Sequence, residues 1–446
     1  MNLKLLPMKP FYLFCLSILA LAVSLRAPAQ KLISEADGYL LNVRLDHENA
    51  LYGIGEPIVY SVTLTRNGKP VDGARITWKC TKDSFYPKLS GELVVREGKA
   101  EYRGRLDEPG FLQFRATFVT PQKSVLSQLS AAGVEPEKIG PSMPPPSDFR
   151  RYWEKLRRRQ EKMPVNLRMT PVQSPVEGVE AFSVEADCLA GTFTGYLCLP
   201  ERSRDRSLPA MLRLEGAGVA SAQLPVAARW AAKGLVVIDF NVNGIPNGRD
   251  RQFYAELNKG PYFQYYMKGA EHRDSLFFRK MILRLMRSID IVTARSEWDG
   301  ENIIAFGRSQ GGGQALIAGG LDPRVKLVCA EIPAVCDHTG PVAGRIGGWP
   351  KLLRTDDRGR IVDRKQVEAV RYADALHFAP YIEGKTYVTV GFIDLSCAPT
   401  SVYSVYNRIR APKEILHHKY TGHVRTREGE DYVARAVTEF LDSLKK

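Results

Sequence analysis

The feature that most restricts the fold is the alternation of short apolar segments with amphipathic helices after about residue 147. The segments that we expect to form strands are 210–214, 235–240, 303–306, 325–330, 387–392 and 414–418. Between them, segments such as 278–292 place apolar side chains three or four residues apart, which is the spacing of a helix face. Apolar strands separated by such helices are typical of a mainly parallel sheet covered on both faces. We therefore predict an α/β domain over residues 147–446.

A different pattern precedes this domain. Short alternating segments, each bounded by turn residues, indicate strands at 39–45, 57–65, 74–80 and 111–118. Regular short strands predict a small all-β sandwich of the immunoglobulin type over residues 30–132. Residues 133–146 are rich in Pro and Gly and are predicted to form a linker. A chain of 446 residues is long enough for two such domains. Nothing in the sequence indicates a role for the sandwich beyond packing or spacing, with glycan binding as the alternative.

The first 29 residues are expected to be a signal peptide. Lys4 and Lys9 precede an apolar run over residues 11–25, and Ala27-Pro28-Ala29 provides a small-residue cleavage site. An uncleaved membrane anchor is the alternative, but the run is shorter than the roughly 20 residues that a spanning helix requires. Cys15 lies inside the apolar run, which disfavours a lipoprotein. We expect a periplasmic or secreted protein with no integral membrane span after processing.

Charge and cysteine content restrict the partners less. The formal charge is +14, and it falls to +11 once Lys4, Lys9 and Arg26 are removed with the leader. The basic residues that cluster near 150–159 alternate with apolar ones at helical spacing, so a solvated helix face explains them. No nucleic-acid-binding motif is present. Six cysteines remain after cleavage, and disulfides and buried thiols are both open possibilities.

The chemistry is indicated by Gly307-Arg308-Ser309-Gln310-Gly311. This G-x-S-x-G segment directly follows an apolar strand and precedes the helical stretch 314–318. That order is the context of the nucleophile elbow in the α/β-hydrolase fold, where a tight turn presents the serine above the sheet. The two glycines are required because side chains would not fit in the turn. Ser309 is the predicted nucleophile, and a Gly-rich turn without catalytic function is the alternative.

A serine hydroxyl needs a base, and the base needs an orienting acid. In this fold the acid and then the histidine follow the serine, each after a later strand. Asp394 follows the expected strand 387–392, and His423 follows 414–418, so they are the predicted acid and base. The competing histidines are His338, His417 and His418, and the less well placed acids are Asp363 and Asp374.

The oxyanion that forms on the substrate carbonyl needs backbone donors. One is expected from the residue after the nucleophile, which is Gln310. The second is expected from the loop after strand 210–214, whose sequence is Glu215-Gly216-Ala217-Gly218. Within this loop Ala217 is the predicted donor.

These residues resemble carbohydrate esterase family seven, the acetyl xylan esterase and cephalosporin C deacetylase family, from about residue 147 to the end. The resemblance depends on several motifs in order, namely Gly307-Arg308-Ser309-Gln310-Gly311-Gly312, Leu321-Asp322-Pro323-Arg324-Val325, Pro333-Ala334-Val335-Cys336-Asp337, Gly391-Phe392-Ile393-Asp394, Cys397-Ala398-Pro399 and Gly422-His423. It implies an α/β-hydrolase fold, with Ser309, Asp394 and His423 as the triad and with Ala217 and Gln310 as oxyanion donors. It also implies acetylated xylan or xylo-oligosaccharides as substrates, with no metal or cofactor.

Two segments depart from the pattern of this family. Its His-Gly-Tyr loop is Glu215-Gly216-Ala217 here, so the tyrosine side chain is missing, although the backbone amide is kept. Its Arg-Gly-Gln segment is replaced by residues 241–246, Asn-Val-Asn-Gly-Ile-Pro. The chain therefore resembles a divergent branch with an added sandwich. An oligomer is possible, but the family's ring-like assembly does not follow.

We expect a serine esterase that removes acetyl groups from acetylated xylan through an acyl-enzyme. The alternatives are an esterase for another small ester (glucuronoyl, feruloyl or short-chain) and a decayed hydrolase that only binds glycans. The missing tyrosine would enlarge the acyl site, but bulky residues near the motifs, such as Trp349 and Phe392, are expected to refill it and preserve the preference for acetyl.

Processing provides the first testable prediction. Cleavage after Ala29 should leave Gln30, or a close neighbour, as the first residue of the exported protein. Intact-mass spectrometry of the exported protein measures this directly. Recovery of a membrane-bound product that still begins at Met1 would contradict the prediction.

Overall fold

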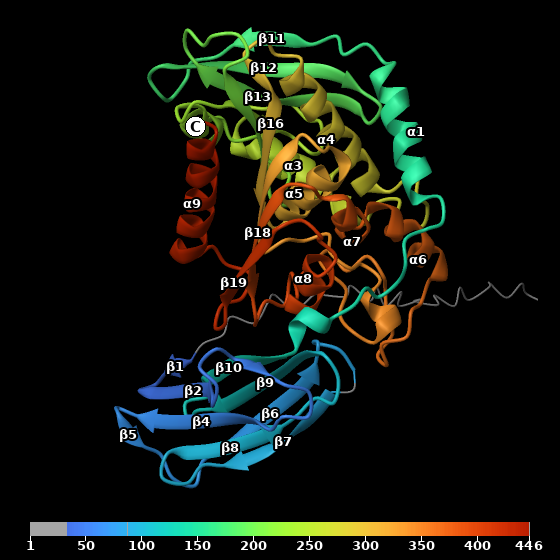
Figure 1. Cartoon of the computed structure of the whole chain (residues 1–446). Helices are drawn as coiled ribbons and strands as arrows, with labels where there is room; N and C mark the ends of the chain where they lie inside the picture. The colour runs from blue at the N-terminus through green and yellow to red at the C-terminus, as the bar shows by residue number, and fades with distance from the viewer. Residues whose placement is uncertain (1–33, 87, 446) are drawn as a thin grey trace, which may run out of the picture.

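The structure is a computed structural model that describes residues 34–86 and 88–445 (Figure 1). The leader expected at residues 1–29 lies outside the described residues. Two small sheets formed by the amino-terminal part of the chain lie below a large sheet that is covered by helices (Figure 1). The α/β-hydrolase fold with a preceding all-β region is thus the observed fold class.

The amino-terminal part contains two five-stranded sheets, which are mostly antiparallel. The first has the order β1-β2-β4-β5 with β8 beside β4, and the second has the order β3-β10-β9-β6-β7. The strands are β1 (Glu35–Ala36), β2 (Tyr39–Leu45), β3 (Leu51–Tyr52), β4 (Ile58–Arg66), β5 (Lys69–Pro70), β6 (Arg75–Lys82), β7 (Lys88–Val94), β8 (Lys99–Gly104), β9 (Gly110–Val119) and β10 (Val125–Val134). All four strands expected here are present, as β2, β4, β6 and β9. Strand β10 was missed because it is buried on both faces and has no alternating pattern.

The large sheet has nine strands in the order β11-β12-β13-β15-β14-β16-β17-β18-β19. The strands are β11 (Arg168–Pro171), β12 (Val179–Cys188), β13 (Gly191–Pro200), β14 (Leu208–Leu214), β15 (Val236–Phe240), β16 (Trp298–Arg308), β17 (Val325–Glu331), β18 (Lys385–Gly391) and β19 (Lys413–His418). Strands β14 to β19 are parallel to one another and correspond to the six expected strands. Strands β11 to β13 add an antiparallel edge that the sequence did not predict.

Helices cover both faces of this sheet (Figure 1). They are α1 (Phe149–Glu161), α2 (Leu224–Ala231), α3 (Arg251–Lys259), α4 (Phe277–Thr293), α5 (Gln310–Leu321), α6 (Arg364–Val370), α7 (Ala375–Phe378), α8 (Pro399–Tyr406) and α9 (Arg427–Ser443). Short 3-10 turns are η1 (Pro136–Lys138), η2 (Tyr265–Met267), η3 (Gly340–Ala343), η4 (Arg371–Ala373) and η5 (Ala379–Tyr381). Helices α2 and α9 enclose one apolar core, and α1, α4 and α5 share the other. Among the described residues, no helix combines the length and apolarity needed to cross a membrane.

The six described cysteines are all free and buried. They are Cys80, Cys188, Cys198, Cys329, Cys336 and Cys397. Burial raises the pKa of each thiol, so these side chains stay protonated and behave as small apolar groups. Of the two possibilities that the sequence left open, the structure has buried thiols.

The segment between the sheets is packed against the catalytic region. Strand β10 runs to Val134, so it includes the first two residues of the expected linker. Beyond it, Asn407 donates to the carbonyl of Pro136 at 2.9 Å, and Arg345 donates to the carbonyl of Gly140 at 2.6 Å. Ser142 also hydrogen-bonds to Asp337. The Pro/Gly-rich composition therefore produces a fixed connection here.

The two regions share one continuous apolar core. Phe111 of β9 is fully buried, and its ring lies edge-on to Phe392 with centroids 5.1 Å apart. Buried Asp83 accepts hydrogen bonds from the Phe111 amide at 2.7 Å and from the hydroxyl of Thr400 on α8 at 2.5 Å. Since Phe392 lies two residues before Asp394, the sandwich packs directly behind the turn that carries the predicted acid.

This shared core leads to a stability prediction. Phe111→Ala should reduce the free energy of unfolding by about 3–5 kcal/mol, because it leaves a cavity between the two regions. Urea denaturation followed by fluorescence measures the loss, and Leu89→Ala, at a side chain that is 56% exposed, is the control with little effect. A loss below about 1 kcal/mol for Phe111→Ala would show that the interface contributes little to stability.

Candidate active site

Ser309 occupies the turn between β16 and α5. Its backbone has φ 56° and ψ −119°, a conformation that residues with a side chain rarely adopt. Three backbone hydrogen bonds hold it there: its amide donates to Glu331 at 2.9 Å, and its carbonyl accepts from Gly313 at 3.1 Å and Ala334 at 2.8 Å. The strained turn is the nucleophile elbow that the sequence predicts.

The glycines on either side of Ser309 are sterically required. A Cβ atom at Gly307 would overlap the backbone of Gly311. A Cβ atom at Gly311 would overlap the carbonyl of Leu214 at the end of β14. The G-x-S-x-G spacing therefore allows the turn to lie flat against the neighbouring strand.

The three predicted triad residues meet in one hydrogen-bonded chain. Nε2 of His423 lies 2.9 Å from Oγ of Ser309, and Nδ1 lies 2.7 Å from Oδ2 of Asp394. Asp394 is fully buried, and its other oxygen accepts the amides of Ser396 at 2.7 Å and Cys397 at 2.9 Å. The imidazole is 30% exposed, so substrate can reach it. Three residues that span 114 positions of the sequence thus form the geometry of a serine hydrolase triad.

The competing histidines lie elsewhere. His338 is fully buried, and burial lowers its pKa to about 3, so it stays neutral. His417 lies 2.6 Å from the hydroxyl of Tyr403, and His418 lies 3.1 Å from that of Thr426. These contacts assign the three rings to packing and local hydrogen bonding.

The competing acids cap helices. Asp363 accepts the amide of Lys365 at the start of α6. Asp374 accepts the amide of Leu376 at the start of α7 and also binds the backbone of residues 337 and 338. Capping the amino end of a helix is a common structural role of aspartate and involves no catalysis.

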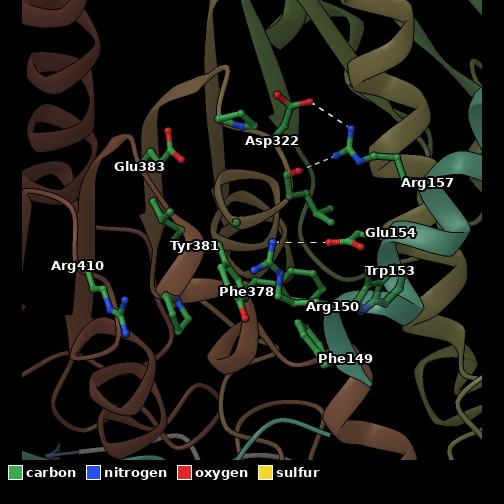
Figure 2. A pocket seen from close by; sticks show the side chains of 15 residues that line it. Phe149, Arg150, Trp153, Glu154, Arg157, Asp322, Phe378, Tyr381, Glu383 and Arg410 are labelled. Atoms are coloured by element: carbon green, nitrogen blue, oxygen red, sulfur yellow. Dashed lines mark hydrogen bonds and ion pairs between the residues drawn. The ribbon is translucent and has the colours of Figure 1, made fainter. Parts of the chain in front are cut away.

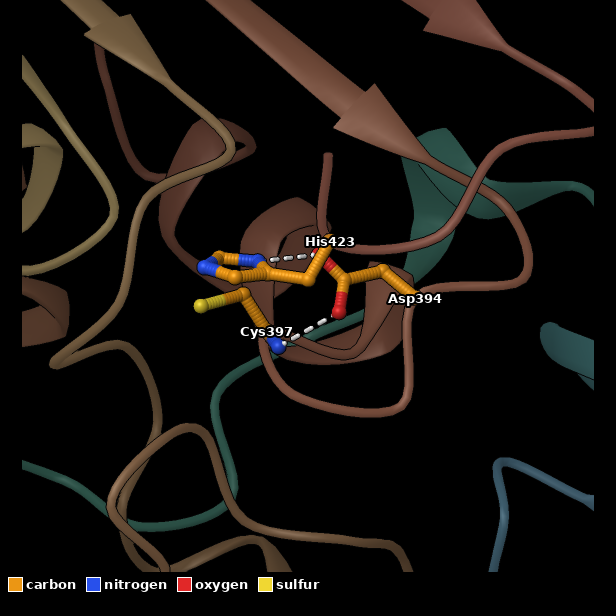
Figure 3. Close-up of side chains that lie close together, drawn as sticks. All are labelled: Asp394, Cys397 and His423. Carbon is orange, nitrogen blue, oxygen red and sulfur yellow. Dashed lines mark hydrogen bonds and ion pairs between the residues drawn. The ribbon is translucent and has the colours of Figure 1, made fainter. Parts of the chain in front are cut away.

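A thiol lies beside the triad. The potential ligand atoms of Cys397, Asp394 and His423 all lie within 4.8 Å of one another (Figure 3). Zinc binds the thiolate form of cysteine, but burial raises the pKa of this thiol well above its usual value. Asp394 and His423 are in addition committed to each other and to Ser309. The arrangement therefore fits proton transfer better than metal binding.

The predicted oxyanion donors lie at the amino end of α5 and in the facing loop, residues 215–218, which we call the oxyanion loop. The first intrahelical hydrogen bond of α5 is donated by Gly313, so the amide of Gln310 precedes it and points out of the helix end. In the loop, the side chain of Gln314 donates to the Glu215 carbonyl at 3.1 Å. Ala217, two residues after Glu215 in this loop, is exposed. Helix α5 thus positions both the nucleophile and the loop.

A surface hollow lies away from the triad, between α1 and the turn η5. It has a volume of about 490 Å³, with Phe149, Trp153 and Phe378 at its base (Figure 2). The charged groups that line it are mostly paired, since Arg157 binds Asp322 and Arg150 lies 3.6 Å from Glu154. The lining contains no nucleophile and base in contact, so the chemistry belongs to the elbow and not to this hollow.

Comparison with known proteins identifies the family. The model of the acetyl xylan esterase (AXE1) family matches residues 137–444, which is more than half of the chain. This chain belongs to the acetyl xylan esterase family. The resemblance noted in the sequence is therefore confirmed, and the protein is an ester hydrolase.

Relatives of this acetyl xylan esterase family member support the same assignment. The acetyl esterase Axe7A of Xylanibacter ruminicola is 29% identical over 387 residues, which cover 83% of this chain and 84% of that protein. This share is larger than the family match, so the alignment extends into the amino-terminal sheets. Part of the sequence before residue 137 therefore aligns with that relative.

Solved structures of similar fold cover the catalytic region. An acetyl xylan esterase from a Paenibacillus species matches with a TM-score of 0.57 and 24% identity, over 68% of this chain and 97% of its own. Acetyl xylan esterase 1 from a Thermoanaerobacterium species matches with a TM-score of 0.55 and 21% identity, over the same shares. At these identities the likeness establishes the α/β-hydrolase fold.

Sequence reasoning missed the residues that hold the oxyanion loop. Gln314 lies in a helix of small residues, and Tyr265 begins the 3-10 turn η2 between α3 and α4. Neither belongs to a motif, so no pattern in the sequence marked them. Their contacts with the loop depend on the tertiary fold.

Proposed function

We propose that this protein is a serine esterase that removes acetyl groups from acetylated xylan or xylo-oligosaccharides through an acyl-enzyme. The observation that carries the proposal is the hydrogen-bonded chain from Asp394 through His423 to Ser309 at a strained elbow. Membership of the acetyl xylan esterase family supplies the substrate class.

The geometry supports the following first half-reaction. His423 Nε2 takes the proton from Ser309 as its Oγ attacks the acetyl carbonyl carbon. The negative charge that forms on the carbonyl oxygen is met by the amides of Gln310 and Ala217. The tetrahedral intermediate then collapses, the bond to the sugar oxygen breaks, and His423 returns the proton to that oxygen. The products are a free sugar hydroxyl and acetyl-Ser309.

The second half-reaction repeats these roles with water. His423 takes a proton from water as the water oxygen attacks the acetyl carbon of acetyl-Ser309. Collapse releases acetate and returns the proton to Ser309 Oγ. Asp394 keeps the imidazole in one orientation throughout, because two backbone amides hold its other oxygen.

Two alternatives are less well supported. A decayed hydrolase that only binds glycans would not need to keep three triad residues in contact with a strained elbow. Esterases for feruloyl or glucuronoyl groups act on larger esters, and acetate release from acetylated xylan, measured below, separates these from an acetyl esterase. We also propose that the protein acts in the periplasm or outside the cell, because residues 1–29 have the pattern of a signal peptide.

One prediction of the proposed function concerns the triad. Ser309→Ala should lower kcat for p-nitrophenyl acetate by about 10⁴ or more, and Asp394→Asn should also be severe because it misorients His423. Ser288→Ala removes the hydroxyl of a buried serine on α4, which donates to the Leu285 carbonyl, and should leave kcat unchanged. Near-normal hydrolysis by Ser309→Ala would rule out the triad, and the same assay on acetylated xylan, measured as released acetate, tests the substrate.

The acyl site differs from the expectation in one respect. Phe392 does not refill the space beside Ala217, because its ring is fully buried against Phe111 of the sandwich. Trp349 does lie near the nucleophile, since its carbonyl accepts the amide of Val335 in the segment that binds Ser309. Its ring packs against Tyr266 with centroids 5.1 Å apart. Refilling of the space beside Ala217 by the Trp349 ring stays a prediction.

Another prediction of the proposed function concerns the length of the acyl group. A site refilled by Trp349 should prefer acetyl, because extra methylenes cost typically 1–3 kcal/mol of overpacking, or roughly 5- to 150-fold in kcat/KM. The measurement is kcat/KM for p-nitrophenyl acetate, butyrate and octanoate, corrected for intrinsic reactivity. Values that stay equal or rise toward octanoate would contradict an acetyl preference and indicate a broad esterase.

A further inference from the structure

We infer that Tyr265 and Asn243 are positioning residues that hold the oxyanion loop in its active geometry. The inference rests on the proposed function, because it concerns the same reaction. It adds two residues that lie outside the triad and outside every motif of the sequence. Its starting point is the way in which the loop is bound to the rest of the protein.

Both backbone groups of Gly218 are held by side chains. The Gly218 amide donates to the hydroxyl of Tyr265 at 2.9 Å, and the Gly218 carbonyl accepts from the side-chain amide of Asn243 at 3.0 Å. Gly218 directly follows Ala217, the predicted oxyanion donor. The Gly218 amide belongs to the peptide that follows Ala217, so these two hydrogen bonds fix one side of Ala217 and limit where its own amide can point.

The other end of the loop is held as well. The Glu215 carbonyl accepts from Gln314 at 3.1 Å, and the Gly216 amide donates to the carboxylate of Glu215 at 3.1 Å. That carboxylate also binds Arg213, which lies 3.0 Å from the buried carboxylate of Asp239. The Glu215–Gly216 peptide and the Ala217–Gly218 peptide are therefore both held, and the peptide that carries the Ala217 amide lies between them. Such preorganisation is what an oxyanion donor needs, since a donor that must reorient contributes less to the transition state.

Tyr265 also connects the loop to Gln310, the other expected oxyanion donor. It lies in η2 and is only 4% exposed, with its ring edge-on to Phe277 at 4.6 Å. Its hydroxyl donates to the side-chain oxygen of Gln310 at 3.3 Å while it accepts the Gly218 amide. Burial raises the pKa of Tyr265, so the hydroxyl remains protonated and can make both bonds. One side chain thus links the two residues whose amides are expected to bind the oxyanion.

The same contacts explain the two departures from the family pattern. The loop has Ala217 where the pattern has a tyrosine, so its own side chain provides no anchor. The replaced segment 241–246 lies against this loop: Asn241 donates to the Ala220 carbonyl at 2.7 Å, and Asn243 binds Gly218. Tyr265 instead reaches the loop from a distant part of the chain through its bond to the Gly218 amide. The two substituted segments and Tyr265 therefore act as one unit.

The test is Tyr265→Phe, which keeps the ring and removes only the hydroxyl. We expect kcat for p-nitrophenyl acetate to fall about 10- to 100-fold, because small misplacement of a catalytic group has effects of this size. KM should change less than about twofold, since the substrate carbonyl carries little charge before reaction. The Kd of phenylboronic acid, which becomes a tetrahedral anion on Ser309, should rise by the same factor as kcat falls.

Two further variants make the result decisive. Tyr60→Phe removes a fully buried tyrosine hydroxyl in the sandwich, which binds the Leu112 carbonyl, and should leave kcat and boronate affinity unchanged even if stability falls. Asn243→Ala removes the other hold on Gly218 and should reproduce the loss in kcat. It also serves as the test if Tyr265→Phe does not fold.

The outcomes separate this inference from the proposed function. Normal kcat and boronate affinity in a folded Tyr265→Phe or Asn243→Ala, or a loss that appears in KM alone, would overturn the positioning role. If Ser309→Ala abolishes activity at the same time, the proposed function stands and only this inference fails. Activity that survives Ser309→Ala would overturn both.

Discussion

The active site depends on the strained backbone of Ser309. A residue at φ 56° and ψ −119° is unfavourable by itself, so the surrounding structure must hold it. Strand β17 and the following segment do so through Glu331 and Ala334, and β14 presses against Gly311. Because three parallel strands and one helix meet at this turn, the hydroxyl has one orientation, and His423 and Asp394 can be placed against it from later strands.

The amino-terminal sheets form part of this support. Their core is continuous with that of the catalytic region, and Phe111 fills the space behind Phe392, two residues from Asp394. Asp83 links the same strand to the first turn of α8, which follows the Asp394 turn directly. The sandwich therefore packs against the acid turn of the triad.

The oxyanion loop shows how a divergent site can keep its chemistry. The backbone amide of Ala217 needs no particular side chain, so the sequence of the loop can change. Its orientation must still be held, and here Gln314, Tyr265 and Asn243 hold it from three different elements. When the catalytic donor is a backbone amide, the side chains that must be kept are those that hold the loop in place, and not those of the loop itself.

Some of this was determined by the sequence alone. The alternation of strands and helices, the elbow and the positions of Asp394 and His423 after later strands are patterns along the chain, and parallel strands bring their carboxyl ends to one edge of the sheet. The six central strands and the meeting of the three triad residues could be predicted for this reason. The choice of His423 over His417 also followed from chain order, because a base needs a loop beyond the strand end.

Only the tertiary structure decided the rest. Strands β10 and β13 are buried on both faces, so they lack the alternation by which strands are recognised. Phe392 was expected in the acyl site and lies in the interface, because its neighbours come from β9, which is far away in sequence. Tyr265 reaches Gly218 and Gln310 across 47 and 45 residues, respectively. Such contacts depend on how separate elements pack, and a single sequence carries no local signal for them.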